Sequence, residues 1–121
     1  MKPVKQTKLS ADDDGDCFCA CIASILELPL SEVPHFTDRL WFRRYNNWLR
    51  KFGLKLLRVK NIDLRNSGYT IEVGDSPRYV YHAVVCKNGK RVHDPHPSNE
   101  FLLPDAMQDV IKRYIFVPIN P

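Results

Sequence analysis

The spacing of the apolar residues changes about halfway along the chain. Residues 17–28 are apolar on nearly every side of a helix, which predicts a central helix covered by other elements. Residues 39–52 repeat aromatic and apolar side chains every three or four positions, which predicts a second helix with one buried face. Asp38 and Gly53 are expected to cap the second helix. Between the helices, residues 30–36 are expected to form a turn or a single helical turn.

Beyond the second helix, apolar and polar residues alternate as they do in β-strands. A short helix is expected at residues 104–112, and residues 1–8 are expected to be extended, as an edge strand or an arm along the surface. This order predicts the α+β class, with N-terminal helices packed on a C-terminal antiparallel β-sheet. The chain has 121 residues and no linker or repeat, so residues 1–121 are expected to form a single domain. Strands are expected at residues 54–59, 69–73, 79–86, 91–94 and 113–119.

The hairpin formed by the third and fourth expected strands has an Asn-Gly tip that permits two registers. A two-residue loop would place Ala83 opposite Asp94, with His82 and Asp94 on opposite faces. A three-residue loop over residues 87–89, with a G1 bulge, would place His82 opposite Asp94 on one face, with their Cβ atoms about 5 Å apart. The sequence allows both registers. We favour the second because only that register brings a carboxylate to an imidazole.

Composition and charge are those of a soluble globular protein. Hydrophobic residues make up 44% of the chain and charged residues 26%, and the net charge is +4. The basic N-terminus is not followed by an apolar run, so a secretory signal is not expected. The most apolar segment, residues 18–30, is too short to span a bilayer and contains Glu27 and Pro29. We therefore expect a cytoplasmic protein without a membrane partner. The oligomeric state cannot be inferred from the sequence.

Residues 39–60 contain eight Lys or Arg residues and no acidic residue. Such a segment, rich in aromatic residues, is a candidate for binding nucleic acid or another acidic partner. Aromatic side chains at helical spacing, however, are expected to be buried in the core, and the arginines then form a solvated face. We favour this second interpretation.

Three of the four cysteines crowd the start of the first helix, at positions 17, 19 and 21, and the fourth is Cys86. This spacing suits neither a disulfide framework nor a tetrahedral metal site, so reduced thiols are expected. Cys17 is expected to be the first helical residue, with Asp16 as the N-cap. The free N–H groups and the macrodipole at a helix start stabilise a thiolate, which makes Cys17 a candidate nucleophile. His82 and Asp94 are the candidate base and orienting group.

Two segments resemble metal sites in part, but no metal or cofactor is expected. Residues 10–16 superficially resemble a calcium loop, but their glycine and acids are not at EF-hand positions. A zinc site is the other possibility. In the favoured register, however, His93 faces away from His82, and no closely spaced Cys/His pair is present. The candidate zinc ligands are Cys17, His82, His93, Asp94 and His96.

Three segments together resemble the papain-like cysteine peptidase superfamily, and most closely the compact C39-like peptidases and short papain-like proteins of bacteria and phages. They are Gly15-Asp16-Cys17-Phe18-Cys19-Ala20-Cys21, His82-Ala83-Val84-Val85 and Val92-His93-Asp94-Pro95-His96-Pro97. The resemblance implies that Cys17 is the nucleophile, His82 the general base and Asp94 the residue that orients it.

Papain-like enzymes also carry a Gln, commonly about six residues before the Cys, as an oxyanion donor. This chain has Ala11 there, and its only nearby Gln is Gln6, eleven residues before Cys17. Gln6 can fill the role if the loop over residues 10–16 brings it back beside Cys17. The acidic run in that loop counts against thiol activation, because negative charge raises a thiol pKa, although it could recruit a basic substrate.

The expected function is that of a thiol hydrolase, which cleaves a peptide, isopeptide or other amide bond through an acyl-enzyme intermediate. The same triad supports deamidation, transglutamination and acyl transfer. The alternative is a non-catalytic papain-like binding module that holds a protein or nucleic-acid partner. Such a module would use either the cleft or the basic face of residues 39–60.

Overall fold

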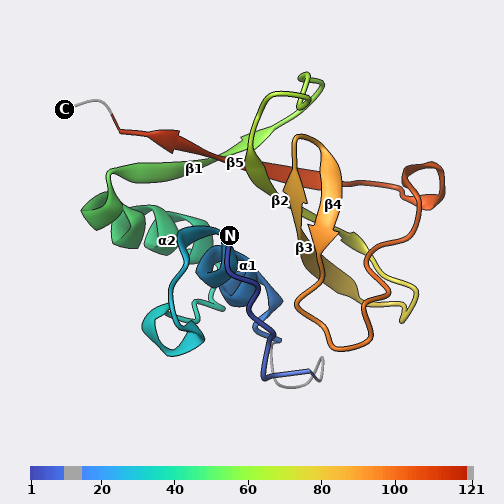
Figure 1. Cartoon of the computed structure of the whole chain (residues 1–121), viewed down its shortest axis with the longest axis horizontal. Coiled ribbons are helices and arrows are strands. Elements are labelled where there is room, and N and C mark those ends of the chain that lie inside the picture. Colours follow the sequence, from blue (N-terminus) through green and yellow to red (C-terminus); the bar gives the residue numbers. More distant parts are fainter. Residues whose placement is uncertain (10–14, 120–121) are drawn as a thin grey trace.

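The computed structural model describes residues 1–9 and 15–119, in which two α-helices precede a five-stranded antiparallel sheet (Figure 1). The predicted α+β class is therefore confirmed. The helices are α1 (Cys17–Leu26) and α2 (Trp41–Leu49), and two short 3-10 turns, η2 (Leu30–Glu32) and η3 (Arg50–Phe52), follow them. The strands are β1 (Leu54–Val59), β2 (Tyr69–Asp75), β3 (Tyr81–Lys87), β4 (Lys90–His93) and β5 (Lys112–Pro118).

The strands lie in the order β1-β5-β2-β3-β4, and every neighbouring pair is antiparallel. The last strand of the chain therefore inserts between the first two. Ile71 of β2 pairs with Tyr114 of β5, and both side chains are buried. The strand β5 therefore joins β1 to the other three strands, β2-β3-β4, in one sheet (Figure 1).

Each helix ends at a residue in the left-handed conformation. The first helix is two residues shorter than predicted, because Glu27 adopts φ 58° and Leu28 N–H bonds to the Ala23 carbonyl at 2.9 Å. This 6→1 bond is typical of a Schellman motif. The second helix continues through η3 to Gly53, at φ 70°, as its sequence predicts. The predicted cap at Asp38 is wrong, because Leu40 is the N-cap and α2 begins at Trp41. The Asp38 carboxylate instead accepts the Leu40 N–H at 3.0 Å, before the helix starts.

The main core lies between the helices and one face of the sheet. The buried side chains of α1, such as Ile22, pack with Leu49 of α2 and with Ala83 and Val85 of β3. An aromatic cluster formed by Phe18, Trp41, Tyr45 and Tyr114 extends this core, with ring centroids 5.3–6.3 Å apart. Burying each large apolar side chain stabilises the fold by about 1.5–3 kcal/mol. This core fixes α1 on β3.

The second face of the sheet is covered by the segment between β4 and β5. Leu102 packs there on Val84 and Cys86 of β3. The buried Glu72 carboxylate accepts hydrogen bonds from Arg91 at 2.7 Å and Arg113 at 3.2 Å. These bonds satisfy a carboxylate that would otherwise be buried without partners.

The helix predicted over residues 104–112 is wrong. Only Asp105–Met107 form a 3-10 turn, and Lys112 already belongs to β5. The segment has no apolar face to bury, since Met107 is exposed. Side-chain bonds hold it instead: Gln108 binds the backbone of Asp75 through both its amide atoms, at 2.8 Å.

Within the described residues, no helix has the length and apolarity needed to cross a membrane.

Candidate active site

The N-terminal segment is an arm fastened between α1 and the end of β4. The Val4 N–H donates to Ser24 Oγ of α1 at 2.9 Å, and the Val4 carbonyl lies 2.8 Å from His93 Nε2. Two residues further on, the Gln6 N–H donates to the Pro95 carbonyl at 3.0 Å. The arm therefore connects the start of the chain to both of the elements that carry the predicted site residues.

Asp16 folds this arm back toward the start of α1. Its buried carboxylate accepts the Thr7 N–H at 3.0 Å, the Lys8 N–H at 2.9 Å and the Thr7 hydroxyl at 2.9 Å. Asp16 is the N-cap of α1, as predicted, but its side chain makes no capping hydrogen bond, because the arm takes up the carboxylate. These bonds place Gln6 and Cys17 on the wall of one cleft, although eleven residues separate them.

Gly15 is needed where the arm meets the helix. A Cβ atom on Gly15 would lie 3.2 Å from the Lys8 carbonyl oxygen and 3.7 Å from Gln6 Nε2. The first distance is closer than ordinary van der Waals contact. The glycine thus allows the arm to approach the chain just before Cys17.

The hairpin between β3 and β4 has a two-residue turn, so the predicted three-residue loop is wrong. Lys87 pairs with Lys90 across the turn. Asn88 and Gly89 have φ values of 52° and 84°. Two successive positive φ values are the requirement of a type I′ turn, which matches the twist of the flanking strands.

A β-bulge in β4 nevertheless brings Asp94 to His82. Beyond the turn the register shifts, because Val85 pairs with His93 and Val92 is left as an extra residue. Without the bulge, a two-residue turn would place the side chains of Asp94 and His82 on opposite faces of the hairpin. The bulge moves Asp94 by one position, to the face that carries His82. His82 and Asp94 therefore share a face, as predicted, but the β-bulge aligns them and not the predicted three-residue loop.

His82 and Asp94 form a buried hydrogen-bonded pair. His82 Nε2 lies 2.5 Å from Asp94 Oδ1, and the side chains are 3% and 0% exposed. The carboxylate also accepts the backbone N–H groups of His96 and Phe101, each at 2.8 Å. Burial raises the pKa of Asp94, but these hydrogen bonds outweigh it and hold the pKa at about 2. Asp94 is therefore an anion at neutral pH.

Opposing effects also act on the pKa of His82. Burial disfavours the imidazolium, whereas side-chain hydrogen bonds to Asp94 and Cys17 favour it. The hydrogen bonds outweigh burial, and the pKa of His82 is raised. Because Nε2 faces Asp94, Nδ1 is the ring atom available to the Cys17 thiol.

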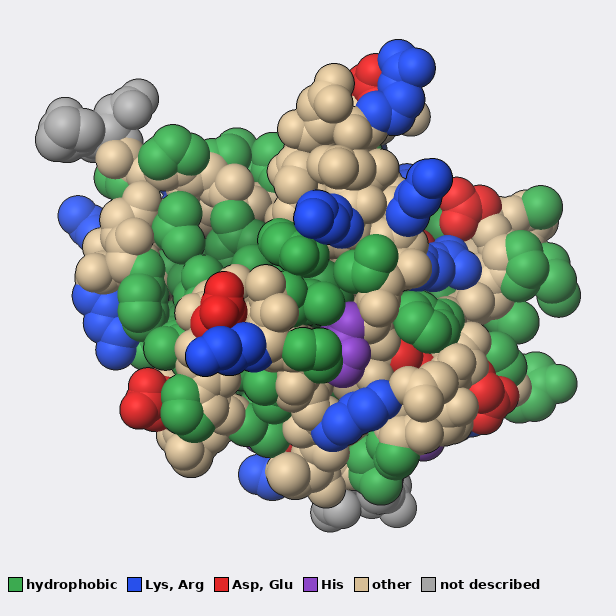
Figure 2. Space-filling model, in the orientation of Figure 1, with side chains coloured by type: hydrophobic (Ala, Val, Ile, Leu, Met, Phe, Trp, Pro, Cys, Tyr) green, Lys and Arg blue, Asp and Glu red, His purple; other side chains and the backbone are tan. Residues whose placement is uncertain are grey.

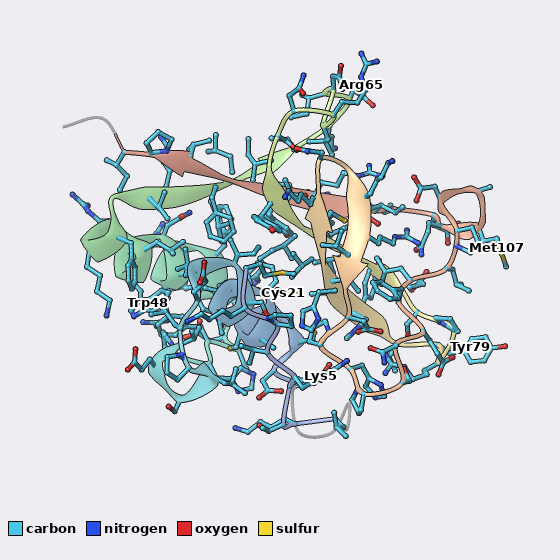
Figure 3. The ribbon with its side chains drawn as sticks, in the orientation of Figure 1. Lys5, Cys21, Trp48, Arg65, Tyr79 and Met107 are labelled. Atoms are coloured by element: carbon cyan, nitrogen blue, oxygen red, sulfur yellow. The ribbon has the colours of Figure 1, made fainter. Side chains whose placement is uncertain are left out.

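Cys17 differs from the other three cysteines in exposure. All four thiols are free, as predicted, but Cys17 is only half-buried whereas the others are buried. Burial raises the pKa of Cys19 to about 11 and that of Cys86 to about 12, and it raises the pKa of Cys21 well above its ordinary value. These three thiols are therefore kept protonated and shielded from solvent. Figure 3 shows Cys21 between α1 and the sheet.

A cleft of about 550 Å³ opens beside Cys17. Gln6, Cys17 and His82 all line it, together with aromatic side chains that include Trp41, Tyr81 and Tyr114. Gln6 Nε2 donates to the Lys8 carbonyl at 2.8 Å, and its buried Oε1 atom has no hydrogen-bond partner in the described part of the chain. The Gln6 amide is therefore not fully satisfied by the protein itself.

The start of α1 supplies further donors. Ala20 makes the first helical hydrogen bond, to the Asp16 carbonyl at 3.0 Å. The N–H groups of residues 17–19 accordingly have no partner within the helix. The N–H of Cys17 is therefore free of helical bonding at the position where an oxyanion would form beside the thiol.

Lys5 and Arg78 are site residues that sequence reasoning missed. Lys5 Nζ donates to the carbonyls of Asp94 and His96 and to Asn99 Oδ1, at 2.6–3.1 Å, and so holds the loop that follows β4 (Figure 3). Arg78 lines the cleft. Neither residue belongs to a periodic pattern or motif, and no signal in the sequence distinguishes them from surface cations.

The residues considered for zinc are used in other contacts. His93 Nε2 contacts the Val4 carbonyl, and His96 Nδ1 lies 2.9 Å from Ser98 Oγ. Over residues 1–9 and 15–119, no group of three His, Cys, Asp or Glu side chains is arranged to hold a metal ion. The calcium-like loop and its acidic run fall largely on residues 10–14, which lie outside the described residues.

The basic segment 39–60 places its central aromatics in the core. Tyr45 is buried and Trp41 half-buried, whereas Arg39, Arg43 and Arg50 are exposed. Figure 2 shows Lys and Arg side chains along the edge where α2 and η3 lie. The aromatic face therefore packs toward the core and the basic face is solvated, as expected, except that Phe52 at the end of η3 is exposed.

Comparisons of the chain with protein-family models, with curated proteins and with solved structures found no match. The functional assignment therefore depends on the geometry of this cleft.

Proposed function

We propose that the protein is a thiol hydrolase of papain-like type, which cleaves a peptide, isopeptide or other amide bond. The observation that carries the proposal is the buried Asp94–His82 pair, whose remaining ring nitrogen is available to the half-buried thiol of Cys17. A nucleophile next to a base, with the base oriented by a third group, is the general arrangement for covalent catalysis.

In this mechanism, His82 takes the thiol proton and the sulfur of Cys17 attacks the amide carbonyl carbon. Collapse of the tetrahedral intermediate breaks the C–N bond, and the imidazolium gives its proton to the leaving amine. Water then attacks the thioester, with His82 again as the base, and releases the acid product and the free thiol. Asp94 remains an anion throughout and stabilises the imidazolium.

Gln6 and the Cys17 N–H are the proposed oxyanion donors. The carboxamide of Gln6 has one N–H committed to the Lys8 carbonyl, and its second N–H has no partner among the described residues, so it can donate to a ligand. Loss of one such donor typically lowers the rate by about 10²- to 10³-fold.

Resemblance to the papain-like superfamily adds support. The residues follow in the order Cys, His, Asp, and they occupy a helix start, a strand and the end of the adjacent strand. The two helices and antiparallel sheet are compatible with a compact papain-like fold. A papain-like module that binds a partner without turnover is the competing proposal, and it predicts no dependence of any product on Cys17.

The test is to incubate the purified protein with mixed peptide and isopeptide substrates and to detect products by mass spectrometry. We expect cleavage or deamidation products that vanish in Cys17→Ala and His82→Ala. We also expect a thioester adduct on Cys17 after rapid acid quenching. Products that persist in Cys17→Ala would contradict Cys17 as the nucleophile, and the absence of both products and adduct would favour the binding module.

A further inference from the structure

Arg78 is held at the cleft by a tightly bonded turn between β2 and β3. The buried Ser76 donates both its N–H and its hydroxyl to the Val80 carbonyl, at 3.0 and 2.9 Å, and the Tyr79 N–H donates to the Ser76 carbonyl at 2.9 Å. Pro77 restricts the turn further. The side chain of Tyr79 is 93% exposed and points away from the body of the molecule (Figure 3), whereas Arg78 lines the cleft.

One edge of the Arg78 guanidinium is buried without a partner. Its Nε and Nη2 atoms are both buried, and neither has a hydrogen-bond partner within residues 1–9 and 15–119. A buried charged group left unpaired is strongly unfavourable, so an unpaired guanidinium edge indicates that something else binds there. Functional sites are the usual places where such a penalty is retained.

The unpaired edge has the geometry that binds a carboxylate. Nε–H and Nη2–H point in the same direction and match the two oxygens of a carboxylate. Arg65 of this protein uses the same two atoms on the two oxygens of Asp63, with Nε–Oδ1 3.1 Å and Nη2–Oδ2 2.7 Å. Arg91 and Arg113 also have carboxylate partners, Glu72 and Asp105.

The surroundings of Arg78 favour an anion near the reacting atoms. The described residues that line the cleft include two cations, Arg78 and Lys112, and no acidic residue. The ring of His96 lies edge-to-face on that of His82, with centroids 6.0 Å apart. Burial and the positive charge of Arg78 lower the pKa of His96. The positive charge of Arg78 therefore acts on His96, the ring next to the proposed general base His82.

We propose that Arg78 binds a carboxylate of the substrate, so that the bond attacked by Cys17 lies next to an acidic group. This inference rests on the proposed thiol hydrolase function and names its substrate class. Two sources supply the same chemistry: the side chain of a substrate Asp or Glu, and the C-terminal carboxylate of a peptide. Arg78 is then a specificity residue that acts on substrate binding.

The test uses matched alkylating reagents that differ only in charge. Iodoacetyl-glutamate amide and iodoacetyl-glutamine amide probe a side-chain carboxylate, and iodoacetyl-glycine and iodoacetyl-glycinamide probe a terminal one. The second-order rate constant at Cys17 is measured for each reagent by peptide mapping. For at least one pair we expect the acid to react about tenfold faster than its amide, the effect of one charge-assisted contact.

In Arg78→Ala the acid-to-amide ratio is expected to fall to about 1. Arg78→Lys should retain part of the preference, and Arg43→Ala, which removes an exposed cation of α2, should retain all of it. Thermal unfolding of Arg78→Ala provides the check on folding. Equal ratios in the wild type and Arg78→Ala, or a wild-type preference for the amides, would overturn the proposal.

Failure of the Arg78 proposal can be told apart from failure of the thiol hydrolase proposal. If His82→Ala leaves the rate with the neutral amides unchanged, the thiol hydrolase proposal fails, whereas the acid-to-amide ratio still reports on Arg78. If His82→Ala lowers that rate but Arg78→Ala leaves the ratio unchanged, only the substrate class is wrong.

Discussion

The imidazole of His82 meets the carboxylate of Asp94 at 2.5 Å although the hairpin turn alone would place them on opposite faces. The extra residue in β4, Val92, corrects the register by one position. Backbone N–H groups from His96 and Phe101 then fix both carboxylate oxygens. The pair is thus positioned by backbone geometry as well as by the side chains themselves.

Replacing Asp94 by Asn should lower activity and stability together. The NH₂ group of the asparagine must occupy the place of one of the two carboxylate oxygens. In the place of Oδ2 it would face the Phe101 N–H, which is also a donor. In the place of Oδ1 it would donate to His82 Nε2 and select the wrong tautomer of the imidazole. We expect kcat/KM to fall by about 10²- to 10⁴-fold. Steady-state kinetics at pH 7 measure this change, with Asp38→Asn at the exposed start of α2 as the control. Unchanged kinetics in Asp94→Asn would show that His82 does not depend on this carboxylate.

Stability should decrease in acid because of the same carboxylate. The pKa of Asp94 is lowered from 3.8 to about 2 in the folded protein. A carboxyl group whose pKa is lower in the folded protein stabilises the fold at every pH above its pKa in the unfolded chain. This stabilisation is lost as the pH falls through the pKa of the folded protein. We expect about 2 kcal/mol to disappear between about pH 5 and pH 2. Urea unfolding across this range measures it, and Asp94→Asn should show a shallower acid loss; an equal slope would contradict the assignment.

Gln6→Ala should reduce turnover more than binding. The Gln6 amide lines the cleft and is only partly satisfied by Lys8, which suits a donor that acts on the transition state. We expect kcat to fall by about 10²- to 10³-fold with little change in KM. Thr7→Ala, which alters the arm at the next position without touching the amide, serves as the comparison. A loss confined to KM would assign Gln6 to substrate binding instead.

Asp16→Ala should unfasten the arm. It removes the acceptor of two backbone N–H groups, those of Thr7 and Lys8, and each unsatisfied donor costs about 1–3 kcal/mol where it stays buried. We expect a lower free energy of unfolding and also a loss of activity, because Gln6 depends on the arm for its position. Denaturant melts and kinetics measure the two effects. Asp16→Ala activity equal to that of the wild type would show that the arm does not position the site.

The sequence predicts most of the elements because their signals are local. Gly53 marks the end of the second helix, and apolar alternation marks the strands. The positions of β1 and of most of α2 follow closely. The segment over residues 104–112 could not be predicted in the same way. Its conformation depends on bonds from Gln108 to Asp75, which is distant in the sequence.

The predicted site residues, Gln6, Cys17, His82 and Asp94, all lie at or next to the cleft, but the physical reasons differ from those expected. The bulge at Val92 has no sequence signature, and it replaced the loop that was predicted to align the pair. Arg78 could not be found at all, because the absence of a partner for its guanidinium is visible only in three dimensions.

The rate at which Cys17 reacts with iodoacetamide at pH 6–7 tests most directly whether His82 activates this thiol. We expect Cys17 to be labelled far faster than Cys19, Cys21 and Cys86, and we expect His82→Ala to slow the labelling of Cys17 at least about tenfold by removing the adjacent base. Peptide mapping of the labelled sites gives both results in one experiment. Slow labelling of all four thiols, or a Cys17 rate that does not change in His82→Ala, would contradict the assignment of Cys17 as a nucleophile activated by His82.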